Sequence, residues 1–452
     1  MSDLPSKTRV LIVGGGIVGC SVAYHLTKIG WSDVVLLEQG RLSCGTTWHA
    51  AGLVGQLRAT QNQTELAKYT RDLYTGLEGE TGQATGYRST GSISVARTLE
   101  REEELKRQSG MAAAFGVEVQ RISLNDAKER APLLNIEDLV AAYLIPSDGM
   151  TNPTDTTQAL ARGARNGGAK LIENIKVSRI LTKNEQVIGA DTDQGRIEAE
   201  IVVVCAGMWT RELCTPIGVD VPLHAAEHYY IVTRPIKGVI RNQPVIRDMD
   251  GYIYIKEEVG GLILGGFEPN AKPWGMDGIP DGFEFQALPE DWDQFEVFMN
   301  TGLERFPGLA DAEIRQLFVG PESFTPDNRY ILGEAPALRK LYVAAGFNSI
   351  GIQSAGGAGK ALAEWIVEDE PTMDLAELDI RRFHRAERNR AYLFDRTKES
   401  LGLLYAMHWP YFQPTTGRGA RRSPFHDRLD AAGACFGVTM GWERPMWFAD
   451  KG

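Results

Sequence analysis

Cysteine is scarce in this sequence, and its spacing marks neither a disulfide framework nor a metal site. The 452 residues contain five cysteines, an odd number with no Cys-x-x-Cys pair. Zinc sites require closely spaced ligands, and disulfide-rich secreted domains carry even numbers of cysteines. Cys20 and Cys205 lie inside apolar runs and are expected to be buried. We therefore expect a reducing compartment and no metal.

Long apolar runs and excess positive charge are also missing. No stretch approaches the length of a membrane span, and residues 1–7 are too short and polar for a secretory signal. Lys and Arg number 48 against 59 Asp and Glu, which gives a net charge of −11. This balance argues against nucleic acid and anionic membranes as partners. We expect a cytoplasmic protein, or a mitochondrial matrix protein if a transit peptide has been removed.

What the sequence does contain is typical of a globular enzyme. Hydrophobic residues make up 43% and charged residues 24% of the chain, and glycine occurs 49 times. A chain of 452 residues is about three times a typical domain in length, which favours two intertwined domains. The glycines gather where the backbone approaches something closely, as a nucleotide-binding fold requires.

A dinucleotide-binding fingerprint opens the chain. Residues 8–13 predict a strand, and the helical pattern that follows runs to Ile29. Between them Gly14, Gly16 and Gly19 fill a G-x-G-x-x-G turn, whose helix N-terminus binds a pyrophosphate. A second strand, 34–37, ends on Glu38, a carboxylate suited to a ribose diol.

The run from Ser43 to Gly52, which contains Thr46-Thr47-Trp48-His49-Ala50-Ala51-Gly52, is similar to the segment that lies along the flavin in the dimethylglycine/sarcosine dehydrogenase family. In that family the histidine holds FAD covalently, so the resemblance implies a covalent FAD on His49. The alternative is that His49 only hydrogen-bonds the isoalloxazine.

Two later segments resemble further markers of this family. Ala206-Gly207-Met208-Trp209 follows the apolar strand 201–205, and residues 341–347 lead through a turn into a Gly/Ala-rich helix reaching Val367. The resemblance also implies that Val177 contacts the adenine. The predicted cofactor contacts are Gly14, Gly16, Ile17, Val18, Gly19, Glu38, Gln39, Gly45, Thr46, Thr47, His49, Ala50, Ala51, Gly52, Val177, Ala206, Gly207, Trp209, Gly346, Gly351 and Ile352.

The fold class implied is α/β, a Rossmann-like FAD-binding domain of the D-amino acid oxidase/sarcosine oxidase type with an inserted antiparallel-sheet substrate domain. We assign residues 1–90, 150–220 and 325–370 to the FAD domain, 91–149 and 221–324 to the substrate domain, and 371–452 to a C-terminal helical and connector segment. Within these, patterning predicts helices at 65–77 and 294–306 and strands at 227–233, 251–256 and 261–267.

Substrate-handling residues are sought on the inserted domain. His228 and Tyr230 share one face of the strand 227–233, and Tyr254 is a better match than Tyr252 to a second family tyrosine. A near-neutral histidine beside a phenol can accept the proton of a substrate ammonium. Arg58 and Arg329 are candidates for binding a substrate carboxylate, and a structural ion pair explains either arginine equally well.

The resemblance implies FAD-dependent oxidative N-demethylation of a small N-methylated amino acid, giving an iminium and then formaldehyde. It extends over the whole chain but only over the oxidoreductase half of the longer family members, so we expect no folate-binding domain. The alternatives are a flavin subunit that passes the one-carbon unit to a folate-binding partner chain, and an oxidase of another amino or imino acid. Either an electron-transfer protein or oxygen can reoxidise the flavin. The basic run 418–422 is interpreted as a solvated linker.

Overall fold

The glycine turn at the start of the chain forms as the sequence predicts. In the computed structural model, which describes residues 4–408 and 412–450, β1 (Lys7–Val13) leads into α1 (Ile17–Lys28) and β2 (Val34–Leu37). Gly14 has a φ of +109°, and a Cβ on it would lie 2.4 Å from the carbonyl oxygen of Cys205. A Cβ on Gly19 would lie 2.0 Å from the carbonyl oxygen of Gly14. Only glycine allows this close packing of turn, helix and strand.

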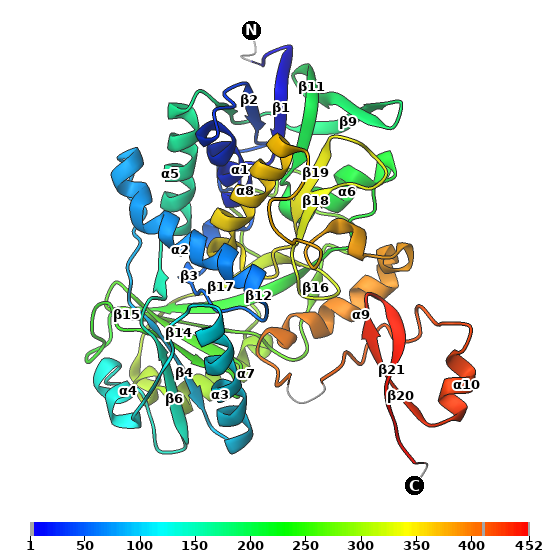
Figure 1. Cartoon of the computed structure of the whole chain (residues 1–452). Helices are drawn as coiled ribbons and strands as arrows, with labels where there is room; N and C mark the ends of the chain where they lie inside the picture. The colour runs from blue at the N-terminus through cyan, green and yellow to red at the C-terminus, as the bar shows by residue number, and fades with distance from the viewer. Residues whose placement is uncertain (1–3, 409–411, 451–452) are drawn as a thin grey trace.

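β1 and β2 belong to an eight-stranded sheet, counted over residues 4–408 and 412–450. Its main path, at the top of Figure 1, runs β18-β19-β11-β1-β2-β8, and the neighbours from β19 to β8 are parallel. The remaining strands, β9 and β10, form an antiparallel meander with β11. The members are β1, β2, β8 (Lys170–Ile172), β9 (Val177–Lys183), β10 (Gln186–Thr192), β11 (Gly195–Val204), β18 (Ile331–Glu334) and β19 (Leu341–Ala345).

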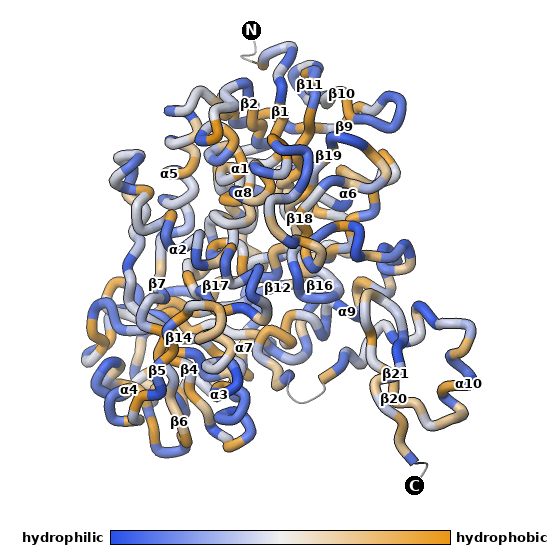
Figure 2. Tube along the Cα trace, viewed as in Figure 1, coloured by the Kyte–Doolittle hydropathy of each residue, from blue (hydrophilic) through white to orange (hydrophobic). Residues whose placement is uncertain are grey.

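Both faces of this sheet are buried. Val10 and Ile12 of β1 pack against α1, α5 (Pro153–Asn166), α8 (Gly351–Glu368) and α2 (Gln61–Thr81), whereas Leu11 and Val13 face the meander. Figure 2 shows hydrophobic residues following these strands. Burial on both faces explains why the strands read as continuous apolar runs.

A second sheet, of nine strands within the described part of the chain, lies below the first in Figure 1. Its order is β16-β12-β15-β14-β13-β4-β6-β5, with β17 paired to β12. Its members are β4 (Ser92–Ala96), β5 (Gln120–Ile122), β6 (Ala141–Ile145), β12 (His224–Thr233), β13 (Val245–Asp248), β14 (Ile253–Glu258), β15 (Gly261–Gly266), β16 (Pro273–Trp274) and β17 (Ile314–Phe324). Helices near it are α3 (Leu99–Ala114), α4 (Leu124–Arg130) and α7 (Trp292–Arg305).

The structure differs from the predicted elements in three places. β17 was not predicted, because Gly320 and Pro321 interrupt its apolar pattern. Proline is tolerated there because, within the described residues, β17 pairs with β12 alone and so forms an edge. β14 begins at Ile253 rather than at 251, since Tyr252 sits in a turn with a φ of +62°. α2 is longer than predicted, because Thr60 caps its N-terminus through the amide of Gln63.

The C-terminal segment is more ordered than a linker. α9 (Arg390–Ser400) packs on β12, and α10 (His426–Ala431) precedes the hairpin β20 (Ala434–Thr439) and β21 (Trp442–Phe448). Arg418 forms an ion pair of 2.6 Å with the buried carboxylate of Glu443. Arg418 itself is exposed, so the ion pair adds a contact to the basic run without removing this residue from solvent. Among the described helices, none is long and apolar enough to cross a bilayer.

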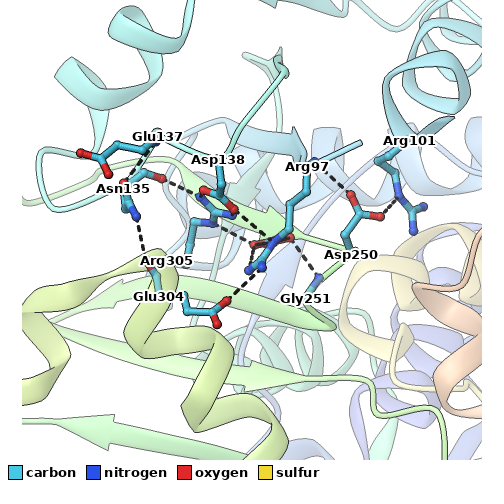
Figure 3. A network of polar contacts seen from close by, with 10 residues as sticks. Arg97, Arg101, Asn135, Glu137, Asp138, Asp250, Gly251, Glu304 and Arg305 are labelled. Carbon is cyan, nitrogen blue, oxygen red and sulfur yellow. Dashed lines mark hydrogen bonds and ion pairs between the residues drawn. The ribbon is translucent and has the colours of Figure 1, made fainter. Parts of the chain in front are cut away.

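A buried charge network anchors β13 (Figure 3). The Asp248 carboxylate receives Nε–H of Arg305 at 2.8 Å and Nη2–H of Arg97 at 2.7 Å, and the side chains of Asp248 and Arg305 are fully buried. Arg305 also forms an ion pair with Asp138 at 2.7 Å. The Arg305 hydrogen bonds lower the pKa of Asp138. The network thereby fixes the strand that carries Arg247, whose side chain points to the opposite face.

We predict that Asp248→Asn lowers the free energy of unfolding by about 3–5 kcal/mol, because the fully buried guanidinium of Arg305 then keeps Asp138 as its one ion-pair partner among the described residues, and Arg97 keeps only the more exposed carboxylates of Glu304 and Asp138. Urea titration measures the change. Glu313→Gln, which breaks the exposed Arg234–Glu313 pair of 2.9 Å, is the control, with an expected loss below about 1 kcal/mol. Equal losses in the two variants would contradict a stabilising role for the network.

Candidate active site

A cavity of about 580 Å³ opens at the carboxyl ends of the parallel strands. Val13, Leu37, Cys205 and Ala345, at or just beyond the ends of β1, β2, β11 and β19, all line it. Ligands of open α/β sheets bind at this edge, where the connections on the two sides of the sheet diverge.

The N-terminus of α1 points at the cavity without a side-chain cap. Its N-cap residue, Gly16, has no side chain to offer, and the Ile17 amide donates to Oγ1 of Thr47 at 3.2 Å. The helix thus begins at the edge of the cavity without a side-chain cap, and the other N–H groups of its first turn are available to bind phosphate oxygens. Gly16, Ile17 and Val18 line the cavity, as the fingerprint predicts.

Glu38 and Gln39 also line the cavity. The Glu38 carboxylate accepts the amide of Gly15 at 2.6 Å and the amide of Gly40 at 2.9 Å. A carboxylate has about four acceptor positions, so these bonds leave capacity for a ribose hydroxyl. The main-chain bonds fix the carboxylate beside the glycine turn.

A second helix, α8, begins at the same cavity. Gly346, Gly351 and Ile352 line it, and the α8 N-cap residue makes no side-chain cap. The turn before α8 is held by buried Asn348, whose Oδ1 accepts the Thr325 amide at 2.8 Å and whose Nδ2 donates to the Gly346 carbonyl at 2.6 Å. The positive end of the helix dipole therefore faces the cavity.

Most of the predicted cofactor contacts line this cavity, and four do not. Gly19 packs against Gly14, and the Gly52 carbonyl accepts the Thr151 amide at 2.8 Å. Ala51 offers its carbonyl to Nζ of Lys256 at 2.9 Å, and His49 is buried without lining the cavity. The residues that do line it are Gly14, Gly16, Ile17, Val18, Glu38, Gln39, Gly45, Thr46, Thr47, Ala50, Val177, Ala206, Gly207, Trp209, Gly346, Gly351 and Ile352.

His49 sits where the two sheets meet. Its ring stacks on Phe318 of β17 with centroids 5.4 Å apart, and a Cβ on Gly320 would lie 2.5 Å from its Cε1 atom. Thr46 adds a hydrogen bond of 3.2 Å from its hydroxyl to the Pro321 carbonyl. The segment 43–52 is thus fastened to β17 on one side and lines the cavity on the other.

The pairing of β12 with β17 brings four residues together on one face. In this register Ala226 lies opposite Glu322, and His228 lies opposite Gly320. His228 and Glu322 are therefore diagonal neighbours, with Cα atoms about 7–8 Å apart. The other two residues of this group, Ala226 and Gly320, are small, and the ring of His49 packs over Gly320.

An aromatic cluster continues from His228. Its ring stacks on Phe267 at 5.1 Å, and Phe267 contacts Tyr254 at 5.9 Å and Tyr405 at 4.7 Å. Tyr230 stacks on Phe318 at 5.1 Å. The structure thus gathers the three predicted residues of the substrate domain. We call this set the aromatic cluster: His228, Tyr230, Tyr254, Phe267, Phe318 and Tyr405.

Glu322 links the aromatic cluster to the cavity, and sequence reasoning missed it. Glu322 lines the cavity, is 5% exposed, and has no hydrogen-bond partner for Oε2 among the residues described. Nδ1 of His228 is likewise buried and unpartnered within those residues. The available signal was an acidic residue closing the largely apolar stretch 317–321.

Burial lowers the pKa of both histidines, so both rings are neutral at pH 7. Burial is the main cause for His49, whose pKa falls to about 4, and the charge of Glu322 opposes the shift. His228 shows the same direction and the same two causes. Burial and then the charge of Glu322 raise the pKa of Tyr230 and Tyr254, so both phenols keep their protons.

The two arginines predicted to bind a substrate carboxylate, Arg58 and Arg329, have different surroundings. Arg329 forms a partly exposed ion pair with Glu377 at 3.4 Å. The guanidinium of Arg58 donates to the Leu57 carbonyl at 2.8 Å and the Gly55 carbonyl at 2.9 Å, and it is not a cavity residue. Burial lowers the pKa of Arg58 to about 10, and the neighbouring Arg247 adds to that shift.

Arg247 is a third cation that sequence reasoning missed. It lies opposite Tyr254 in the β13–β14 pair, so both side chains share a face. No carboxylate forms an ion pair with it in residues 4–408 and 412–450, and its charge lowers the pKa of Tyr405 against the larger effect of burial. A half-buried guanidinium beside the aromatic cluster can bind an external carboxylate.

This site fits FAD. Uncapped helix N-termini suit the pyrophosphate, Glu38 suits the ribose, and close-packed glycines admit the backbone to the ligand. Across residues 4–408 and 412–450, no group of three His, Cys, Asp or Glu side chains is arranged to hold a metal ion.

Comparison with known proteins agrees with the geometry. Residues 9–365 match the family model described as FAD dependent oxidoreductase, and residues 368–423 match the model of the FAD dependent oxidoreductase central domain. The solved structure of L-proline dehydrogenase from P. horikoshii superposes with a TM-score of 0.76 at 26% identity, covering 84% of this chain and 98% of that one. The fold expected from the sequence is confirmed.

Curated relatives extend over nearly the whole chain. A 4-methylaminobutanoate oxidase (formaldehyde-forming) of Paenarthrobacter nicotinovorans is 43% identical over 99% of this chain and 54% of its own length. The mitochondrial pyruvate dehydrogenase phosphatase regulatory subunit of Mus musculus is 44% identical over 98% of this chain and 51% of its own length. Human mitochondrial sarcosine dehydrogenase is 40% identical over 99% of this chain and 49% of its own length.

The chain thus spans about half the length of these relatives. Its glycine turn, its cavity and its family match point to the same conclusion: the chain belongs to the FAD-dependent oxidoreductases, and sarcosine and dimethylglycine dehydrogenases are among the proteins that it resembles.

Proposed function

We propose that this protein catalyses FAD-dependent oxidative N-demethylation of a small N-methylated amino acid. The observation that carries the proposal is the wall that the β17 residues Glu322 and Ser323 contribute to the FAD cavity, beside the paired strand β12. There a buried carboxylate and a neutral imidazole, each with an unpartnered atom among the described residues, face an aromatic cluster. This wall suits a substrate that has a basic nitrogen and apolar methyl groups.

The names of the relatives support the same reaction class. They include an oxidase named as formaldehyde-forming, sarcosine dehydrogenase and dimethylglycine dehydrogenase. FAD supplies the two-electron acceptor for a hydride from the N-methyl carbon. The nitrogen lone pair forms the C=N bond of an iminium, which water hydrolyses to formaldehyde and the demethylated amine.

His228 prepares the amine for this step. A substrate ammonium has no free lone pair and must lose its proton before the C–H bond breaks. The unpartnered Nδ1 of His228 is an acceptor for that proton, since burial keeps the ring neutral at pH 7. Tyr230 and Tyr254, which stay protonated, orient the substrate by hydrogen bonds and ring contacts.

Arg247 is the substrate carboxylate anchor in this proposal. It shares a face with Tyr254, neighbours Tyr405, and has no acidic partner in the described chain. A Cβ on Gly55 would lie 2.6 Å from its Nη2 atom, so Gly55 leaves room for the guanidinium. Arg58, which lies close to Arg247, strengthens the positive field at this end of the site.

We also propose that His49 holds FAD covalently. Its neutral ring has a free lone pair, and Thr47 and Ala50 on either side of it line the cavity. The tether would prevent loss of the cofactor during turnover.

A second function has support from one comparison. The relative named as a regulatory subunit is 44% identical over 448 residues, which favours a role in which the FAD-bearing chain binds another protein. A partner chain that takes up the one-carbon unit belongs to the same class. Copurification of a second polypeptide with a protein that no amine reduces would favour this function.

Of the predictions that follow from this proposed function, the first tests the reaction itself. Without oxygen, a panel of N-methyl amino acids should bleach the flavin absorbance of the purified holoenzyme, with one equivalent of formaldehyde per flavin reduced. The corresponding amino acids without N-methyl groups should leave the spectrum unchanged. Bleaching that releases ammonia instead of formaldehyde would identify an oxidase of another amino or imino acid.

The second prediction concerns Arg247. Arg247→Met should raise KM for an N-methyl amino acid about 10- to 100-fold with little change in kcat, because a charge-assisted bond to the carboxylate is lost. N-methylamines without a carboxylate should not distinguish the variant from the wild type. Arg329→Met is the matched control, and a larger KM effect in Arg58→Met would move the anchor to Arg58.

The third prediction concerns His49. Acid-denatured wild-type protein should retain its flavin fluorescence on a denaturing gel, and His49→Ala should release all of its flavin under the same conditions. His228→Asn, which alters the neighbouring histidine, should keep the flavin attached. Release of flavin from denatured wild-type protein would show that His49 binds FAD without a covalent bond.

A further inference from the structure

Glu322 is a buried carboxylate for which the FAD fold itself gives no use. Its side chain is 5% exposed and lines the cavity, yet no Lys, Arg or His forms an ion pair with it in the described parts of the chain. Burying an ionised carboxylate without a partner costs several kcal/mol. A site that retains such a group generally presents it to a cation supplied by a ligand.

The described neighbours of Glu322 do not bind its carboxylate, and the residues closest to it on the sheet are small. Ala226 lies opposite it, and Gly320 lies two residues earlier on the same face of β17. His228 is the diagonal neighbour of Glu322 across the strand pair, and its Nδ1 has no partner among the described residues. The His49 ring packs over Gly320. Two buried polar atoms thus face one region bounded by small residues.

The charge of Glu322 acts on His49 and on three members of the aromatic cluster. These three are His228, Tyr230 and Tyr254, and together with His49 they come from three separate segments of the chain. All four of these groups are uncharged at pH 7, so none of them neutralises the carboxylate. Arg247 is the cation at the Tyr254 side, and it lies beyond ion-pair distance of Glu322.

From this arrangement we propose that Glu322 binds the cationic nitrogen of the substrate, opposite the carboxylate anchor Arg247. The site would then recognise a zwitterion by two charges of opposite sign held on different strands, β17 and β13. This inference rests on the proposed function and names the residue that selects its substrate class.

The same charge assists the chemical step. Before hydride transfer the substrate nitrogen is neutral, after its proton has passed to His228. When the C–H bond breaks and its electron pair leaves, the nitrogen lone pair forms the C=N bond and the nitrogen becomes positive. A fixed carboxylate beside it stabilises that developing charge at the moment it appears.

A pair of unreactive ligands tests the proposal without turnover. Trimethylglycine carries a quaternary nitrogen that cannot form an iminium, and 3,3-dimethylbutanoate has the same shape and carboxylate with carbon in place of nitrogen. Titration of the oxidised holoenzyme, followed by flavin absorbance, gives Kd for each. Wild-type protein should favour the cation by roughly tenfold or more, and Glu322→Gln should lose this preference.

Two further variants serve as controls. Glu322→Asp keeps the charge and should keep most of the preference. Glu227→Gln changes a buried carboxylate on the opposite face of β12, where Glu227 accepts the Tyr229 hydroxyl, and should leave the preference unchanged. Flavin content and thermal unfolding establish that each variant is folded.

Reduction by substrate separates this proposal from the proposed function. Glu322→Gln should slow anaerobic bleaching about 100-fold or more where wild-type protein is bleached. If no N-methyl amino acid bleaches the wild type, the demethylase proposal fails, whereas the ligand preference still reports on Glu322. If Glu322→Gln retains the preference, or changes the flavin spectrum alone, Glu322 does not bind the cation.

Discussion

The register between β12 and β17 is the constraint on which the site depends. It places His228 opposite Gly320 and Ala226 opposite Glu322. Because Gly320 has no Cβ, the His49 ring can pack directly against its backbone. A slip of one residue would turn every one of these side chains to the other face of the sheet. The FAD cavity and the aromatic cluster are therefore joined through a single strand pair, at the edge where Pro321 is tolerated.

The FAD half of the site is the part that a sequence reveals best. Its signals are local: glycines at fixed spacing, an acid at the end of the next strand, and apolar strands buried on both faces. Gly14, Glu38 and Ala206, which the sequence predicts as cofactor contacts, all line the cavity. His49 was located by resemblance, but its position against Phe318 and Gly320 depends on β17, which is more than 260 residues away in the sequence.

The substrate half was only partly predictable, because its members meet through long-range pairing. His228, Tyr230 and Tyr254 were found on strands with clear alternation. Glu322 was missed because Gly320 and Pro321 interrupt the apolar pattern by which the strand could be recognised. Arg247 was missed because β13, with four residues, is too short to show a clear alternation of apolar and polar residues. Which face an arginine occupies follows from its partners across the sheet, and here alternation with the buried Asp248 decides it.

Tyr405 shows that the C-terminal segment forms part of this site. It contacts Phe267 in the aromatic cluster, and its carbonyl accepts Nη2–H of Arg101 at 3.0 Å. The segment before it is fixed to the second sheet by the Ala271 amide, which donates to the Lys398 carbonyl at 2.8 Å, and by buried Leu401. Tyr405 lies near both Arg247 and the ring of Phe267. In the proposed binding mode, with the carboxylate at Arg247 and the nitrogen beside Glu322, residues 398–405 would therefore border the space between the two charges and limit the length of the substrate.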